Sequence, residues 1–458
     1  MAKDKSGYII AAAFIGPGIV TTASLAGANF GFHLVWALLF SIFATIVLQD
    51  MAARLGVASG QGLASAMKNM AYKPWLKNAF IVLIVSAIGI GNAAYESGNL
   101  TGAAIGLDAF INIGIGPWAS ILGTIAIVLL WSGSYKWIET VLVYLVFIMA
   151  GVFLVTLLVA KPDIAAMFSQ LLSPRLDADA ITTVLALIGT TIVPYNLFLH
   201  ASLVAKSSRG QNKQDAVVAC RNQSAKAISM GGLITLIVMA TAMMAFFNQA
   251  ATMDASNMGE QLKPVLGDKA QWFFALGLFA AGLTSAITAP LAAAYAVTGA
   301  LGLSDDMQSK SFKAVWFIII VVGVSVAALG FKPLPAILFA QATNALLLPI
   351  IAIFLLVVMN KSTALGEFRN TWKSNLAGFV VVGVSVAALG FKPLPAILFA
   401  QATNALLLPI IAIFLLVVMN KSTALGEFRN TWKSNLAGFL VVGTVIGLGL
   451  YKLIGVFS

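Results

Sequence analysis

Long runs of apolar residues, separated by short polar stretches, make up most of this chain. A membrane-spanning helix needs about 20 consecutive apolar residues, and windows of that length recur along the whole sequence. Helices are expected throughout, because in lipid only helices and closed barrels satisfy every backbone hydrogen-bonding group. The pattern predicts thirteen spans, near 8–30, 32–53, 78–104, 116–134, 137–160, 181–205, 226–247, 270–302, 313–331, 335–359, 375–391, 395–419 and 437–456.

Two of these spans contain helix-breaking residues near their centres. Gly16-Pro17-Gly18 interrupts the first span, and the segment Thr190–Asn196, with Pro194, interrupts the sixth. Proline removes a backbone donor, and glycine favours non-helical dihedral angles. A matched pair of broken helices is the best sequence indication of a transporter's binding site. The alternative is two simple kinks, because Pro and Gly are common in membrane helices.

Composition supports a membrane protein and excludes most other classes. Hydrophobic residues make up 60% of the chain and charged residues 9%, and the mean hydropathy is +0.97; soluble domains carry about 25% charged residues. The net charge of +11 is concentrated in alternate loops between the spans, which is a topology signal and not a nucleic-acid surface. We therefore expect a single transmembrane domain over residues 1–458 with a cytoplasmic N-terminus.

One part of the sequence occurs twice. Residues 321–379 recur without a change as 381–439, and each copy encodes two spans. A recent duplication, an engineered insertion and an assembly error all remain possible origins. Removing one copy leaves eleven spans, which we take as the underlying architecture. We expect the first copy to pack in the core, with 375–391 serving as the eleventh span.

Several linked motifs give the chain a family resemblance. They are Leu48–Gly60, close to LQ-x-x-AARLG-x-x-TG; Pro194–His200, close to MPHNLYLH; Leu278–Thr288, similar to an AAGQSST-containing helix; and Gln341 with Pro349, repeated at Gln401 and Pro409, similar to an SQ…LP pattern. In this order the motifs resemble the Nramp family of metal-ion transporters. The resemblance implies an all-α LeuT-like fold, an inverted repeat of five plus five helices whose first and sixth helices are broken. The exact duplication would add two further spans.

The chain departs from this family at the positions that hold the metal. The resemblance places Gly16 and Ile19 where the family has Asp and Asn, and Val193 where it has a methionine sulfur. Tyr195 stands at a family histidine, and Glu96 and Asn99 stand at a family Asp and Glu. A dication stripped of water needs oxygen or nitrogen ligands and normally a counter-charge. We therefore expect no metal site at the usual family positions.

Hydroxyl and amide groups remain around the two breaks. We expect the substrate to be bound by Gly16, Pro17, Gly18, Thr21, Thr22, Thr190, Thr191, Val193, Asn196 and Gln341. Hydroxyls and carbonyls can hold a hydrated cation or sodium, whereas half-helix N-termini suit anions or carboxylates. For any single threonine the alternative is a hydrogen bond to the preceding helical turn.

Two ionisable residues are candidates for ion coupling. Glu96 lies inside a span, and an intramembrane carboxylate is a functional hypothesis by default; it is a proton acceptor, a cation ligand or a gate partner for Arg54, unless it lies near the aqueous end of its helix. His200 is a proton-path residue or a polar packing contact. Asp50 and Arg54 are four residues apart and are expected to pair.

The sequence predicts a transporter and not an enzyme. It contains no HExxH zinc motif, P-loop or clustered carboxylate–histidine site, and no cofactor is expected. The preferred hypothesis is an Nramp-related secondary transporter that moves a cation other than the usual manganese or iron, as a multi-pass protein of a bacterial inner membrane. Its partners would be a small solute or ion and the lipid bilayer, and no nucleic acid. The alternatives are a LeuT-fold carrier of an organic solute or amino acid, and a non-transporting binder on the same scaffold.

Overall fold

The computed structural model describes residues 16–388, apart from 70–77, 79–80, 83, 133–135, 162–163, 174–177, 250–251, 330–332 and 361–364. All described residues belong to the first of two units of the chain, residues 1–389. Every regular element among them is a helix. The predicted spans 395–419 and 437–456, and the beginning of the span 8–30, lie outside the described residues.

The long helices follow the predicted spans up to residue 391. They are α2 (Pro17–Phe30), α3 (Val35–Ser59), α6 (Gly91–Asp108), α7 (Ile115–Ser132), α8 (Lys136–Ala160), α10 (Ala178–Thr191), α11 (Pro194–Ser207), α12 (Lys213–Phe246), α14 (Ala270–Leu301), α15 (Lys310–Ala328), α16 (Pro333–Met359) and α18 (Trp372–Ala388). The short elements are α4 (Leu63–Asn69), the π-helix η1 (Val85–Ile90), α9 (Ile164–Leu171), η2 (Met258–Leu262), α13 (Lys263–Leu266), η3 (Gly267–Lys269) and η4 (Gly366–Phe368). By length and composition, seven helical segments of the described part could cross a membrane.

Both predicted breaks coincide with helix starts. α2 begins with Pro17 after Gly16, and α11 begins with Pro194 after Val193, three residues beyond Thr191, where α10 ends. Proline suits the first position of a helix, because the N–H it lacks would have no helical partner there. The residues before both prolines are extended, and neither side chain caps its helix. Two positive helix ends therefore begin at the breaks.

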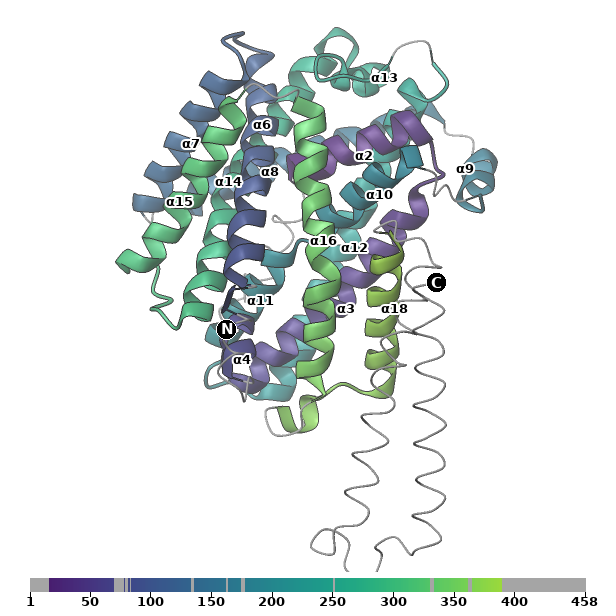
Figure 1. Ribbon diagram of the computed structural model, residues 1–458. Coiled ribbons are helices and arrows are strands. Elements are labelled where there is room, and N and C mark those ends of the chain that lie inside the picture. Colours follow the sequence, from purple (N-terminus) through teal and green to yellow (C-terminus); the bar gives the residue numbers. More distant parts are fainter. Residues whose placement is uncertain are drawn as a thin grey trace, which may run out of the picture. The chain divides into compact units, whose positions relative to one another are not determined.

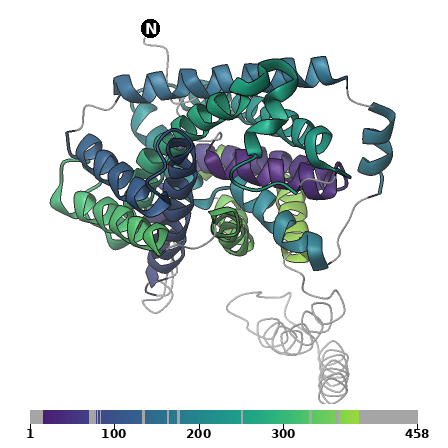
Figure 2. The same ribbon diagram turned by 90° about the horizontal axis from the view of Figure 1, so that it is seen from above.

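The helices form two groups joined by α16. In the first group, α2 packs on α12 and α10, and α3 packs on α11 and α12. In the second, α6 packs on α14, α15 and α7. α16 contacts α10 from the first group and α6 from the second, and it crosses the centre of Figure 1. In the view from above, α2 (purple) lies in the middle of the bundle and α9 at its periphery (Figure 2).

The connecting elements lie at two opposite ends of the bundle. α4 lies at one end and α13 at the other (Figure 1). We call the first the basic end, because the helix ends and the connection there carry Lys206, Arg209, Lys213 and Lys310. The opposite end carries the connection between α12 and α14, which contains η2 and α13.

The first copy of the duplicated sequence packs within the bundle. Its tenth-span helix α16 contacts α10, α6, α2 and α11, and α18 packs on α16 and α3. The shared octapeptide Val-Val-Gly-Val-Ser-Val-Ala-Ala ends both α15 and α18, yet Val321 is 40% exposed and Val381 is fully buried. Identical sequence therefore takes two environments, set by the neighbouring helices. The expectation that the first copy and not the second occupies the core stays a prediction, because residues 389–439 lie outside the described part.

Candidate substrate site at the helix breaks

The break at Gly16 lies against two other helices. Ser285 Oγ of α14 is 2.7 Å, and the Tyr95 hydroxyl of α6 is 3.8 Å, from the place where a Cβ of residue 16 would lie. A Cβ at Gly102 of α6 would lie 2.5 Å from the Cβ of Pro17. The start of α2 is therefore closely packed, and a side chain at residue 16 requires Ser285 to move.

Tyr95 connects this break to the second one. Its ring stands edge-on to that of Tyr195, the second residue of α11, with the centroids 5.2 Å apart. Both rings are buried. The breaks predicted from Gly16 and Pro194 are thus brought together around one tyrosine of α6, which itself was not among the predicted site residues.

Polar atoms without hydrogen-bond partners surround the two breaks. Within the described part of the chain, the hydroxyls of Thr21, Thr22 and Thr190 and both amide atoms of Asn196 are buried and have no partner. Nearly all buried polar groups in proteins are hydrogen-bonded to protein or ordered water. These four side chains are therefore available to a ligand or to water.

Thr191 differs from its neighbour Thr190. Its hydroxyl donates to the backbone oxygen of Leu187, one turn earlier, at 2.9 Å. Its own backbone oxygen accepts from the Thr45 hydroxyl of α3 at 3.4 Å. The simple alternative, a hydrogen bond within the helix, holds for this threonine. Gln341 belongs to α16, and its side chain lies outside the described part.

Glu96 is buried in α6 beside α15. One carboxylate oxygen accepts from Asn99 Nδ2 at 3.3 Å, while Glu96 Oε1 and Asn99 Oδ1 have no partner among the described residues. A Cβ at Gly323 of α15 would lie 2.7 Å from Glu96 Cγ, so the glycine makes room for the carboxylate. Glu96 is therefore fully buried, and it contacts the amide of Asn99.

Arg54 is bound to residues other than Glu96, so the gate pairing, one of the alternatives for Glu96, is not formed in this structure. Its guanidinium donates to Asp50 Oδ2 at 2.9 Å, to the Phe368 oxygen at 2.9 Å and to Asn370 Oδ1 at 2.8 Å. Asp50 also accepts from Arg221 of α12 at 2.7 Å. The expected Asp50–Arg54 pair is confirmed, and Arg54 connects α3 to the turn before α18.

His200 lies on α11 within hydrogen-bonding distance of two other helices. Its Nδ1 is 2.6 Å from Gln49 Oε1 of α3, and its Nε2 is 3.5 Å from the Ser224 hydroxyl of α12. The ring is buried. It contacts protein polar groups on both sides, which fits either a proton-path residue or a polar packing contact.

The residue types at the breaks offer few ligands for a transition metal. No group of three or more His, Cys, Asp or Glu residues that could hold a metal ion occurs among the described residues. Val193 contributes an extended backbone and an alkyl side chain at the start of α11. The oxygens present are hydroxyls, amides and backbone carbonyls, which suit hard or hydrated cations better than soft ones.

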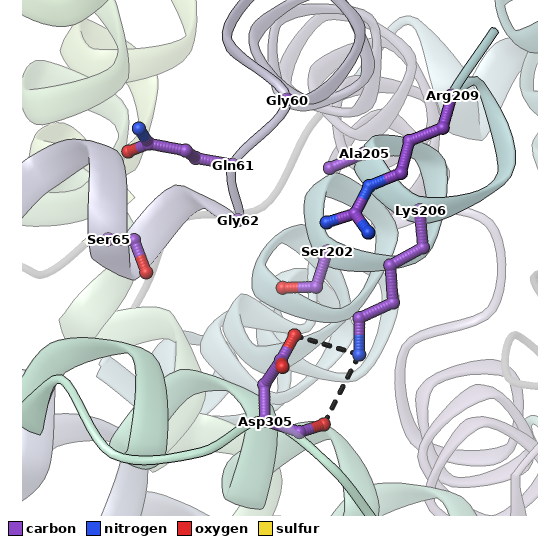
Figure 3. A pocket seen from close by; sticks show the side chains of 9 residues that line it. All are labelled: Gly60, Gln61, Gly62, Ser65, Ser202, Ala205, Lys206, Arg209 and Asp305. Atoms are coloured by element: carbon purple, nitrogen blue, oxygen red, sulfur yellow. Dashed lines mark hydrogen bonds and ion pairs between the residues drawn. The ribbon is translucent and has the colours of Figure 1, made fainter.

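Sequence patterns did not indicate a polar cavity that lies at the basic end. A cavity of 190 Å³ is lined by the turn at Gly60–Gly62 and by Ser65, Ser202, Ala205, Lys206, Arg209 and Asp305 (Figure 3). Lys206 Nζ is 2.7 Å from Asp305 Oδ2 and lies over the ring of Tyr295. Ser202 follows Tyr195 by seven residues, about two helical turns, so the cavity continues the face of α11 that carries Tyr195.

Comparison with known proteins identifies relatives over most of the chain. A family model described as natural resistance-associated macrophage protein-like matches residues 7–390 and, again, 380–455. The divalent metal cation transporter MntH of Yersinia pestis is 28% identical over 393 residues, covering 83% of this chain and 91% of the relative. MntH of Klebsiella pneumoniae is 26% identical over 397 residues, covering 84% and 92%.

Solved structures with the same fold include transporters of more than one kind. The Eremococcus coleocola manganese transporter superimposes with a TM-score of 0.65 at 21% identity, covering 98% of this chain and 92% of that one. Mhp1, a nucleobase-cation-symport-1 family transporter, gives 0.58 at 13% identity, covering 84% and 91%. MhsT in complex with L-phenylalanine gives 0.56 at 14% identity, covering 85% and 97%. These likenesses confirm the predicted LeuT-like transporter fold.

Proposed function

The chain belongs to the natural resistance-associated macrophage protein-like family, and we propose that it is a secondary transporter that moves a cation other than manganese or iron. Its curated relatives are named divalent metal cation transporters. These relatives support metal-ion transport as the general function. The change of cargo is our own inference from the residues at the breaks.

The observation that carries this proposal is the chemistry around the two breaks. Gly16 offers no side chain and Val193 offers only an alkyl group, whereas Thr21, Thr22, Thr190 and Asn196 offer buried oxygens without partners. Uncharged oxygen ligands do not repay the dehydration of a bare transition-metal dication. They suit a cation that keeps part of its water, such as Mg²⁺, or a monovalent ion.

Glu96 is our candidate for ion coupling. It is a buried carboxyl group within the span of α6, one of its oxygens has no described partner, and its neighbour Tyr95 contacts Tyr195 at the second break. Buried ionisable groups in membrane proteins commonly mark proton relays and ion paths. We assign the coupling role to Glu96 and a supporting role to His200, which contacts both α3 and α12.

We place the protein in a bacterial inner membrane with its basic end in the cytoplasm. Seven described segments are long and apolar enough to span a bilayer. The basic end carries Lys206, Arg209, Lys213 and Lys310 at helix ends and in a connection. The positive-inside rule assigns such an end to the cytoplasm, and the cavity beside Lys206 then faces that side.

A carrier of a carboxylate-bearing organic solute is the second candidate. α2 and α11 both begin at the breaks without a side-chain cap, and helix N-termini favour negative charge. The buried amide of Asn196, without a partner, lies in the first turn of α11. This arrangement would recognise a carboxylate if the cargo is not a bare ion.

Uptake into proteoliposomes tests the proposal. We expect uptake of Mg²⁺ or Na⁺ to exceed that of Mn²⁺, and amino-acid uptake would favour the second candidate instead. Thr190→Val should lower cargo affinity, because its hydroxyl is without a partner. Thr191→Val is the matched control, because that hydroxyl already donates to Leu187. Manganese uptake that saturates at about micromolar concentrations, the lower end of the usual range of KM values, would contradict the change of cargo.

A further inference from the structure

A buried glutamine holds the connection between α12 and α14 against two helices of the first group. Gln261 of η2 is 1% exposed. Its Nε2 donates to the Ser24 hydroxyl of α2 at 3.1 Å and to the Met258 oxygen at 2.8 Å. Its Oε1 accepts from the Thr241 hydroxyl of α12 at 3.3 Å. One side chain therefore joins three elements at the end of the bundle opposite the basic end.

The rest of this segment is also inserted into the bundle. Met258 and Leu262 are fully buried, and the Gly259 N–H donates to Gln271 Oε1 of α14 at 2.9 Å. The segment packs on α14, α12 and α8. Loops usually run over the surface of a protein, because buried backbone polar groups need partners. We call residues 258–262 the gate segment.

The gate segment contacts α2 through Gln261, on the side of the helix that carries Thr21. Ser24, which Gln261 contacts, follows Thr21 by three residues, so the two lie on the same side of the helix. Thr21 is buried without a partner, four residues after Pro17. Polar side chains therefore extend from the first break to Gln261. This line of hydroxyls would be the path between the break and water if the gate segment moved away.

We propose that the gate segment closes access to the breaks from the end opposite the basic end, and that Gln261 is the residue that keeps it closed. Opening breaks the hydrogen bonds from Gln261 to Ser24 and Thr241 together. The inference goes beyond the proposed function and needs no knowledge of the cargo. It assigns a gating role to a loop residue that neither the family motifs nor the breaks identify.

Cysteine labelling in purified, detergent-solubilised protein tests this role. Cys220 is the only cysteine, so Cys220→Ser with Thr21→Cys gives a single reporter on the proposed path. Adding Gln261→Ala should raise the labelling rate by a water-soluble maleimide at least fivefold. Gln249→Ala is the matched control, because Gln249 is an exposed glutamine of the same connection, and it should leave the rate unchanged.

Two further variants separate gating from stability. Ser24→Ala and Thr241→Val each remove one partner of Gln261, and each should raise the labelling rate in the same direction as Gln261→Ala. If Gln261→Ala does not fold, the labelling rates of Ser24→Ala and Thr241→Val test the gating role instead. A lower melting temperature with an unchanged labelling rate in all these variants would show that Gln261 only stabilises the fold, and would overturn the proposal. Because labelling is measured without cargo, its failure is distinct from a failure of the uptake experiment.

Discussion

Tyr195 of α11 stands edge-on to Tyr95 of α6, with the two ring planes at 71° and the centroids 5.2 Å apart. The pair lies between the two helix breaks, because Tyr95 also approaches Gly16. Two buried aromatic rings in contact contribute to packing beyond their buried area. Tyr195, which stands where the family resemblance places a histidine, is therefore part of the packed contact between α6 and α11.

This arrangement predicts weak or no manganese binding at the breaks. Gly16→Asp, Ile19→Asn and Val193→Met together should raise Mn²⁺ affinity by about tenfold or more, because they supply a carboxylate, an amide and a soft sulfur. The gain should be larger with Ser285→Ala, since Ser285 Oγ lies 2.7 Å from a Cβ at residue 16. Isothermal titration calorimetry measures the affinity. Val193→Met alone is the control, and tight binding by the unmodified protein would refute the prediction.

Replacing Glu96 should change how transport depends on pH. Glu96→Gln keeps the size of the side chain but cannot exchange a proton, so uptake by this variant should become independent of pH between about 5 and 8. Uptake in proteoliposomes across that range measures the effect. Asp268→Asn, at an exposed carboxylate of the connection before α14, should retain the parental profile. An unaltered profile in Glu96→Gln would remove this residue from the coupling mechanism.

Arg54 should be among the residues on which stability depends most. Its buried guanidinium joins Asp50 to the Phe368 oxygen and the Asn370 side chain. Arg54→Ala should lower the free energy of unfolding by about 3 kcal/mol, because it breaks a largely buried ion pair and leaves acceptors unpaired. Chemical denaturation in detergent measures it. Arg209→Ala, at an exposed arginine of the basic end, should change stability by less than about 0.5 kcal/mol.

Acid should loosen the connection that precedes the gate segment. The Ser256 hydroxyl and the backbone N–H groups of Ser256 and Asn257 donate to Asp254, and these bonds lower the pKa of Asp254 below its usual value. A lowered pKa means that the carboxylate stabilises the folded turn above the unfolded value of about 3.9, and that this contribution is lost as the pH falls through the folded value. Hydrogen exchange of residues 252–257 should therefore speed up at acid pH beyond its intrinsic change. Asp254→Asn should remove that dependence, and Asp268→Asn should not.

The sequence identifies the positions of the breaks because their causes are local. Gly16, Pro17 and Pro194 impose backbone constraints wherever they occur, and the helices do begin at these prolines. Composition and the spacing of apolar windows likewise account for the helical spans up to residue 388. Which of the two adjacent threonines has a hydroxyl without a partner could not be predicted from the local sequence. Thr190 and Thr191 have the same chemistry, and only the helix orientation decides which hydroxyl finds a carbonyl.

Contacts between distant parts of the chain could not be predicted from local patterns. Arg54 contacts residues more than 300 positions away, and no local pattern in the sequence indicates such partners. Gln261 has no local signal, because a glutamine in a polar connection is usually exposed. Its burial follows from the fold of the gate segment against α2 and α12.

The two copies of the duplicated sequence can be compared within one chain, but deleting a copy does not show which of them packs in the core. Deleting 321–380 or 381–440 yields chains that differ only in carrying Leu440 or Val380 at the junction, so neither deletion distinguishes the copies. A point substitution does distinguish them, because each copy has its own Phe-Arg-Asn segment, at 368–370 and 428–430. The guanidinium of Arg54 can contact one of these two segments at a time, and in the structure it contacts 368–370.

The last prediction therefore concerns Asn370 and its duplicate Asn430. Asn370 accepts from Arg54 at 2.8 Å and donates to Asn375 at 2.9 Å, so Asn370→Ala should lower the free energy of unfolding by about 1–3 kcal/mol through unpaired buried groups. Asn430→Ala, the same substitution in the same local sequence, should change it by less than about 0.5 kcal/mol. Thermal and chemical unfolding of both variants in detergent compare them directly. Equal losses would mean that the copies exchange places beside Arg54, and a loss confined to Asn430→Ala would mean that the second copy occupies the core.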